Sequence, residues 1–185
     1  ARVDVLAPVR SPPQTAPTGS GGIVSFARSY MGLGLQLAHE GKLGDGRTWR
    51  LIGGLEHDRS EEDRQGYLNT DGVRGDLKRD ELNTARNTDL YGQAAYDLLS
   101  SLTATAGVRT SKVRFRSDDR FIAPGNVDDS GGVDYSATNP VLGLTFRASP
   151  TLNLYANAGR GFETPTFTER TDEERGVGRL GTLLA

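Results

Sequence analysis

Cysteine is absent from this chain of 185 residues, which excludes a disulfide framework and a thiolate metal site. Long apolar runs are absent too, so no segment reaches the roughly 18 consecutive residues of a transmembrane helix. That absence does not bear on transmembrane strands, which need only about 9–11 residues with every second one apolar. Acidic and basic residues are interleaved and the formal net charge is −2, so no basic footprint for nucleic acid is present.

Signatures of catalysis and export are also missing. The sequence holds no G-x-S-x-G, HExxH or Walker motif, and neither of its two histidines, His39 and His57, has a convincing partner. We therefore predict no enzyme, no cofactor and no metal site. The first ten residues, ARVDVLAPVR, lack the basic and apolar regions of a signal peptide, which predicts a chain that is mature, truncated or not exported.

What the sequence does have is period-two alternation, the signature of strands with two different faces. In residues 25–40, Met31, Leu33, Leu35 and Leu37 alternate with glycines and Gln36. Similar alternation in 48–57, 88–98, 102–115, 135–147 and 152–159 predicts an all-β fold of about six antiparallel strands. Six aromatic residues are candidates for the girdles of aromatic side chains that lie at the two membrane interfaces of a barrel: Trp49, Tyr30, Tyr91, Tyr96, Tyr135 and Tyr155. Ordinary packing between strands would explain them nearly as well.

The predicted connections alternate between two lengths. Tight turns are expected at 43–46, 99–100 and 149–150, and long polar loops at 58–81 and 116–133. Bacterial outer-membrane barrels alternate short turns with long loops in this way. Six strands cannot close such a barrel, because the smallest have about eight, so the chain is expected to be a section of one. The alternative is a soluble β-sandwich binding module, whose apolar face would pack on a second sheet.

The segment GRGFETPTF, residues 159–167, follows the last predicted strand. It closely resembles the YxxxGRGFETPTFNE segment of TonB-dependent outer-membrane receptors, and weaker similarity extends from about Gly22 to Glu169. The resemblance implies a barrel of about 22 strands with a plugged lumen. It also implies uptake of iron–siderophore complexes or a similar scarce nutrient across the outer membrane of a Gram-negative bacterium. The expected partners are outer-membrane lipid, the plug domain, TonB and a siderophore-type ligand.

The resemblance also implies a division of the chain into three regions and a set of candidate site residues. Residues 1–22 are expected to be a loop, linker or incomplete strand region, 23–169 a partial receptor barrel, and 170–185 a divergent, truncated tail. Truncation would leave the chain inactive in isolation, and a decayed remnant of a receptor gene is a third hypothesis. The motif residues, expected at a bend or in contact with the plug or lumen, are Gly159, Arg160, Gly161, Phe162, Glu163, Thr164 and Pro165. The candidate ligand-loop residues are Arg59, Arg64, Tyr67 and Arg120.

Overall fold

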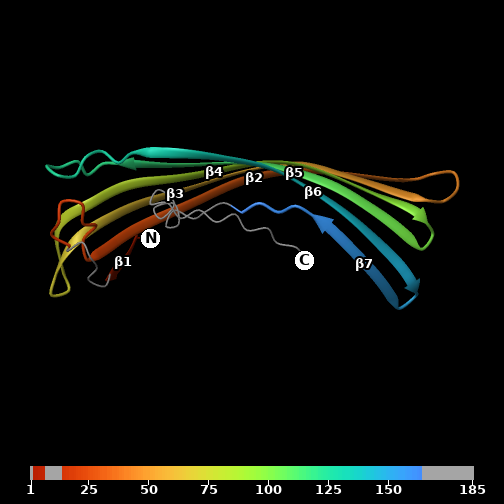
Figure 1. The fold of residues 1–185 in the computed structure, drawn as a ribbon, viewed down its shortest axis with the longest axis horizontal. Coiled ribbons are helices and arrows are strands. Elements are labelled where there is room, and N and C mark those ends of the chain that lie inside the picture. The colour runs from red at the N-terminus through yellow and green to blue at the C-terminus, as the bar shows by residue number, and fades with distance from the viewer. Residues whose placement is uncertain (1, 7–13, 164–185) are drawn as a thin grey trace. The chain divides into compact units, whose positions relative to one another are not determined.

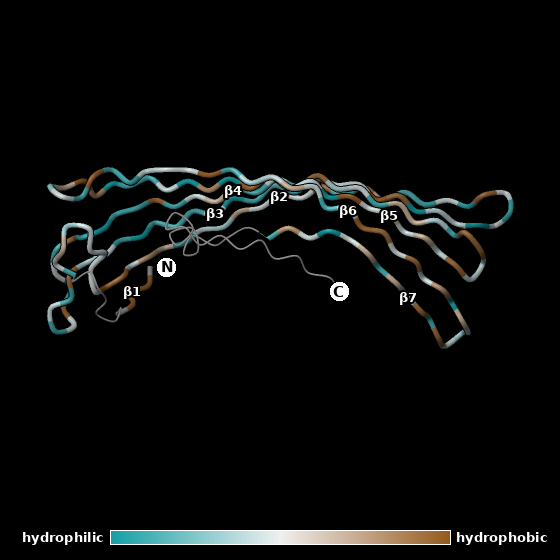
Figure 2. Tube along the Cα trace, in the orientation of Figure 1, coloured by the Kyte–Doolittle hydropathy of each residue, from teal (hydrophilic) through white to brown (hydrophobic). Residues whose placement is uncertain are grey.

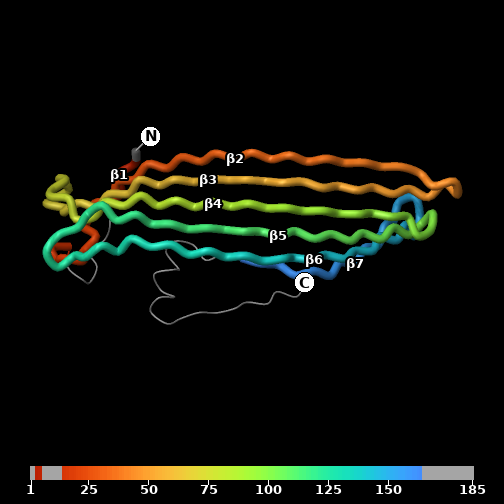
Figure 3. The backbone as a smooth tube through the Cα atoms, turned by 90° about the horizontal axis from the view of Figure 1, so that it is seen from above, coloured from red at the N-terminus to blue at the C-terminus, as the bar shows by residue number. Residues whose placement is uncertain are grey.

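The structure, a computed structural model, describes residues 2–6 and 14–163, and every regular element there is a β-strand. The strands are β1 (Arg2–Leu6), β2 (Ile23–Lys42), β3 (Thr48–Thr70), β4 (Val73–Leu99), β5 (Leu102–Asp119), β6 (Gly131–Ser149) and β7 (Leu152–Gly159). They form one sheet whose neighbours follow the sequence order from β1 to β7 (Figures 1 and 3). Across the described ranges, none of the chain forms a helix suited to crossing a membrane.

The all-β prediction is confirmed, and each predicted strand lies within an observed one. β1 and β2 pair antiparallel, as do β6 and β7. The tight turn predicted at 43–46 is present: Gly46 donates its N–H to the Leu43 carbonyl at 2.8 Å and adopts φ 84°. β1 is a seventh strand inside the region expected to be a linker or incomplete strand.

The loop predicted at 58–81 is wrong, because β3 and β4 continue through it as a long hairpin arm. Asp71 and Gly72 make its turn with φ of 52° and 86°, the pair of positive values that a type I′ hairpin turn requires. The alternation of apolar and polar residues ends near His57, because polar side chains occupy both faces of β3 and β4 beyond it. The hydrogen bonds between the two backbones do not require apolar side chains, so the strands continue. Figure 2 shows the hydrophilic colouring of this arm. The second predicted loop shrinks to 120–130, between β5 and β6.

The chain divides into two compact units. The first comprises Ala1–Leu33, His57–Asn87 and Val113–Asp134, and the second comprises Gly34–Glu56, Thr88–Lys112 and Tyr135–Ala185. In the first unit, the buried side chains include those of Ile23, Ser25, Asn83 and Thr84. Ile23 is the only buried hydrophobic side chain among the residues that the structure describes, so neither unit has an apolar core of ordinary size.

The second unit shows the two faces of the sheet most clearly. In the β6–β7 ladder, Leu144 opposes Ala156 and Phe146 opposes Leu154, whereas the intervening Thr145 opposes Tyr155. Successive side chains of a strand point to opposite faces, so apolar and polar pairs lie on opposite sides of one layer. The apolar side chains are exposed, with Leu37 at 70% and Leu142 at 63%. An apolar patch of this extent marks a contact with protein or membrane.

Candidate functional site

Arg109 is the centre of a charged cluster on the polar face of the second unit. Its Nη2 donates to Glu56 Oε2 and to Asp89 Oδ2, each at 2.6 Å. These three side chains come from the adjacent strands β5, β3 and β4. The Asp89 side chain is 2% exposed, while that of Arg109 is 46% exposed. A buried carboxylate is tolerated only when it is paired and hydrogen-bonded, so Arg109 holds Asp89 in place and still presents part of its guanidinium to the open face.

Tyr91 extends this cluster to β2. Its hydroxyl donates to Gln36 Oε1 at 2.9 Å, and the Arg109 guanidinium lies 5.7 Å from the centre of its ring. The ring also covers Gly54, where an added Cβ would lie 2.5 Å from the tyrosine side chain. Glycine at this position therefore leaves the space that Tyr91 fills. Four neighbouring strands are joined through these side chains.

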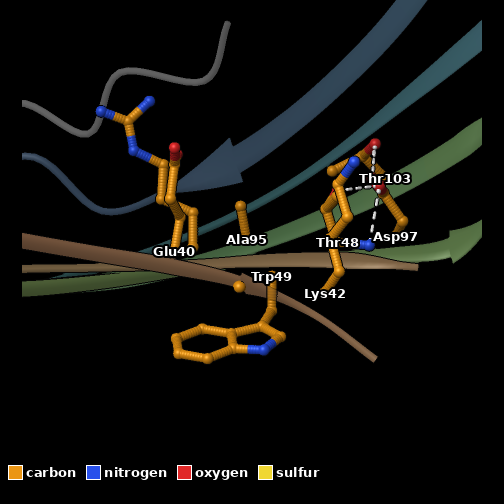
Figure 4. Close-up of a pocket in the computed structure, with 9 residues that line it drawn as sticks. Glu40, Lys42, Thr48, Trp49, Ala95, Asp97 and Thr103 are labelled. Carbon is orange, nitrogen blue, oxygen red and sulfur yellow. Dashed lines mark hydrogen bonds between the residues drawn. The ribbon is translucent and has the colours of Figure 1, made fainter. Parts of the chain in front are cut away.

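A second polar group lies at the end of the second unit that carries the 43–47 turn. Thr103 donates its hydroxyl to Asp97 Oδ1 at 2.7 Å, and Thr48 donates both its hydroxyl and its N–H to Asp97 Oδ2. The crevice beside it is lined by Glu40, Gly41, Lys42, Thr48, Trp49, Arg50, Ala95, Asp97 and Thr103. Figure 4 shows Trp49 on the opposite side of the strands from Thr48 and Asp97. The crevice therefore follows the open sheet surface and is no enclosed binding cavity.

The aromatic residues separate by face. Trp49 contacts His39 with ring centroids 5.0 Å apart, and Arg47 lies 5.6 Å from the Tyr96 ring centre. Trp49 and Tyr96 share the alternation of the leucines in their strands, whereas Tyr91 and Tyr155 alternate with them. Two of the six girdle candidates thus fit the apolar face at the turn end. In the turn itself, the hydrogen bonds from Arg47 lower the pKa of the Asp45 carboxyl below its usual value.

The first unit holds the four predicted ligand-loop residues, but it does not gather them into one cluster. Arg59 pairs with Glu61, and Tyr67 donates its hydroxyl to Gln65 Oε1 at 2.7 Å. These positions alternate with Arg64 along β3, so Arg64 lies on the opposite face. Arg120 follows β5 and its guanidinium lies 3.6 Å from Asp63. The polar face at Arg64 also carries the hydrogen bond that the Tyr30 hydroxyl donates to Asp58 Oδ1, at 2.6 Å, and the Arg28–Glu62 pair.

The motif begins at a strand end. Gly159 is the last residue of β7 and pairs with Val141, and Arg160 donates its N–H to the Pro140 carbonyl at 3.0 Å. A Cβ added at Gly159 would lie 3.1 Å from the same carbonyl oxygen, which fits a close backbone approach at a bend. Gly161, Phe162 and Glu163 continue without regular structure, and Thr164 and Pro165 lie outside the described residues.

Asp89 and Tyr91 are site residues that the sequence interpretation did not nominate. The sequence does contain a signal for them, because both residues occupy positions of β4 that alternate with Leu90 and Leu98 and so belong to the polar face. No group of three or more histidine, aspartate or glutamate side chains within residues 2–6 and 14–163 could hold a metal ion. The arrangement offers fixed hydrogen-bond donors and acceptors on an open polar wall.

The second unit has one apolar face and one hydrogen-bonded polar face, as the wall of an outer-membrane barrel does. The sequence model for the family described as "TonB dependent receptor-like, beta-barrel" matches residues 8–182, and the chain therefore belongs to that family. Its fold is similar to that of the ferric citrate transporter FecA in the unliganded form, with a TM-score of 0.65 and 18% sequence identity. The match covers 83% of this chain and 23% of the FecA chain, so this chain spans about a quarter of that transporter.

Proposed function

We propose that the chain forms part of the barrel wall of an outer-membrane receptor that takes up iron–siderophore complexes or a comparable scarce nutrient. The observation that carries the proposal is the contrast between the two faces of the second unit. Leu37, Leu142 and Leu144 are exposed on one face, and lipid would cover them. Each such side chain contributes roughly 1.5–3 kcal/mol when it leaves water, which favours a membrane location over an aqueous one.

The polar face would line the lumen. Asp89 and Arg109 could not face hydrocarbon without a large cost, since charged side chains on the lipid face of a barrel cost about 2–4 kcal/mol at mid-depth. Facing inward, Arg109, Glu56 and Tyr91 offer hydrogen bonds to the plug domain that the family carries. Arg59, Arg64, Tyr67 and Arg120 in the first unit are the residues that we propose for ligand contact. Of these, Arg64 alternates with the other two β3 positions and so would face the lumen. Uptake itself would use TonB energy, and the protein would act as a transporter and not as an enzyme.

Transport would require the intact receptor. β1 and β7 are the two edges of the sheet, and an open edge in lipid leaves unpaired backbone groups that cost several kcal/mol each. Further strands must pair with these edges before the wall can span a membrane. The soluble β-sandwich hypothesis is not favoured, because residues 2–6 and 14–163 supply one sheet and no second layer over the leucines.

The test is iron uptake by the full-length receptor in iron-starved Gram-negative cells that lack their own iron receptors. Radioactive iron would be offered as citrate, hydroxamate and catecholate chelates, with and without a functional TonB. We expect the receptor in the outer-membrane fraction and TonB-dependent uptake of at least one chelate class. A receptor that fractionates as a soluble protein would refute the wall assignment, and absence of uptake for every chelate would refute the iron substrate.

A further inference from the structure

The turn between β3 and β4 contains one of the two Asp-Gly dipeptides of the chain. Asp71-Gly72 forms the tip of this hairpin, and Asp45-Gly46 lies in the turn between β2 and β3. In such a dipeptide the backbone nitrogen of glycine can attack the carboxyl carbon of the aspartate side chain, because glycine has no Cβ to obstruct the approach. The two dipeptides share this intrinsic chemistry, so their surroundings decide which of them reacts.

Arg47 holds the Asp45 carboxylate at both of its oxygen atoms. Its guanidinium donates from Nε to Asp45 Oδ2 at 2.5 Å, and its backbone N–H donates to Oδ1 at 3.1 Å. These bonds favour the ionised carboxylate and lower the pKa of Asp45. A carboxyl oxygen leaves readily as water only when the group is protonated, so the bound and ionised Asp45 is a poor target for attack.

Asp71 has different surroundings. Its side chain is exposed, and none of the residues that the structure describes forms a hydrogen bond or an ion pair with its carboxyl group. Its φ is 52°, in the left-handed region that is unfavourable for a residue with a Cβ atom. Gly72 donates its N–H to Asn69 Oδ1 at 2.8 Å, so an acceptor lies beside the proton that the attacking nitrogen must lose. The carboxyl group of Asp71 is therefore unrestrained where that of Asp45 is held.

We propose that Asp71-Gly72 is a site of spontaneous covalent modification, at which Asp71 closes to a cyclic imide and reopens as isoaspartate. Closure forms a bond between Gly72 N and Asp71 Cγ, and the hydroxyl of the carboxyl group leaves as water with the amide proton. Water then adds to one of the two imide carbonyls. Addition at Cγ restores aspartate. Addition at the former backbone carbonyl breaks its bond to Gly72 N, so the chain runs through Cγ and a free α-carboxylate remains.

The position of Asp71 at a hairpin tip favours both the reaction and its product. Ring closure requires the turn to leave its native dihedral angles briefly, and exposed tips open locally at far lower free energy than the whole fold. Isoaspartate adds one carbon to the backbone between β3 and β4 and releases the left-handed φ of Asp71. A two-residue type I′ turn cannot accommodate the longer backbone, so the modification would remodel the tip of this hairpin.

The test follows both dipeptides in one sample of the full-length protein, aged in lipid vesicles at neutral pH and physiological temperature. Trypsin then releases Asp71 in the peptide 65–74 and Asp45 in the peptide 43–47. Isoaspartate and aspartate have the same mass, and electron-transfer fragmentation distinguishes them in each peptide. We expect at least about 10-fold more isoaspartate at position 71 than at position 45, because two hydrogen bonds to a charged group must break before Asp45 reacts.

Three controls separate the surroundings from the intrinsic chemistry. In urea, both peptides should isomerise at similar rates. Arg47→Ala should accelerate the reaction at Asp45 and leave that at Asp71 unchanged, whereas Asp71→Glu should abolish the product at position 71, because glutamate closes a larger ring far more slowly. Equal amounts of isoaspartate at the two positions of the folded protein overturn the proposal. So does its absence at position 71 over a time in which the unfolded chain forms it. The readout needs no transported substrate and is independent of the proposed function.

Discussion

Replacement of Arg109 by alanine tests the polar face most directly, because it leaves the Asp89 carboxylate buried without its main cation. Loss of one partner of a buried pair costs about 3–5 kcal/mol. Water reaches Arg109, whose side chain is 46% exposed, so we expect a cost below this range, of about 2 kcal/mol. This corresponds to a roughly 30-fold smaller folding constant. The assay is urea unfolding of the full-length receptor in lipid vesicles, followed by tryptophan fluorescence.

Arg114→Ala is the matched control, since Arg114 binds Asp134 through two hydrogen bonds of 2.7 Å. Both side chains of this pair are about half exposed, at 52% and 47%, and exposed pairs contribute about 0.2–1 kcal/mol. A double variant with Arg109→Ala and Asp89→Asn should recover part of the lost stability, because the asparagine is neutral. Equal losses for the two single variants, or a larger loss for Arg114→Ala, would refute the reasoning.

Two further predictions concern neighbouring positions on opposite faces. Leu144→Arg should destabilise the lipid-embedded receptor by about 2–4 kcal/mol, whereas Thr145→Arg should cost below about 1 kcal/mol; urea midpoints in vesicles measure both, and similar losses would contradict the assignment of faces. Gly54→Ala should cost about 1–3 kcal/mol because its new methyl group would lie 2.5 Å from the Tyr91 side chain and 2.8 Å from the Leu35 carbonyl oxygen. Gly53→Ala, whose Cβ would lie 3.8 Å from the Tyr91 carbonyl oxygen, should change stability by only about 0.5 kcal/mol, and a larger effect at Gly53 would show that the contacts at Gly54 are not the cause.

The alternation of the sequence predicted the strands and their faces wherever the two faces meet different surroundings. Leu142, Leu144 and Phe146 lie on one face of β6, as expected, and Arg109 lies on the polar face of β5. Period-two patterning is strong there because one side of each strand carries apolar side chains and the other carries polar ones. The turn at 43–47 was equally readable, since its glycine is needed at a positive φ.

Prediction failed where both faces are polar. From Asp58 to Glu81 the side chains carry no periodic signal, so the sequence predicts a polar loop, although the backbone of β3 and β4 continues as a hairpin. The Asp71-Gly72 pair was the remaining local signal for that hairpin, since an Asp-Gly dipeptide favours a type I′ turn. The hydropathy pattern of a strand depends on what its two faces contact, so a strand with polar surroundings on both faces shows no period-two pattern.

The candidate sites depended on contacts that no spacing rule reveals. Arg109 meets Glu56 and Asp89, which belong to two other strands. Each contact depends on register, which is set by pairing along the whole length of the strands. Period-two alternation alone assigns Arg109 to the face opposite Val108, but it does not reveal which side chains of other strands pair with it.

A wall one residue thick has a consequence for how such a chain changes over evolutionary time. Along β6, residues 144 and 145 are covalent neighbours, yet they face opposite sides of the layer. In the membrane wall that we propose, mutations at even and odd positions of β6 would therefore meet different demands, one from the lipid on the outer face and the other from whatever lies in the interior. If the proposed function holds, changes in one set of residues would alter what the interior binds and leave the lipid-facing set of the same strand untouched.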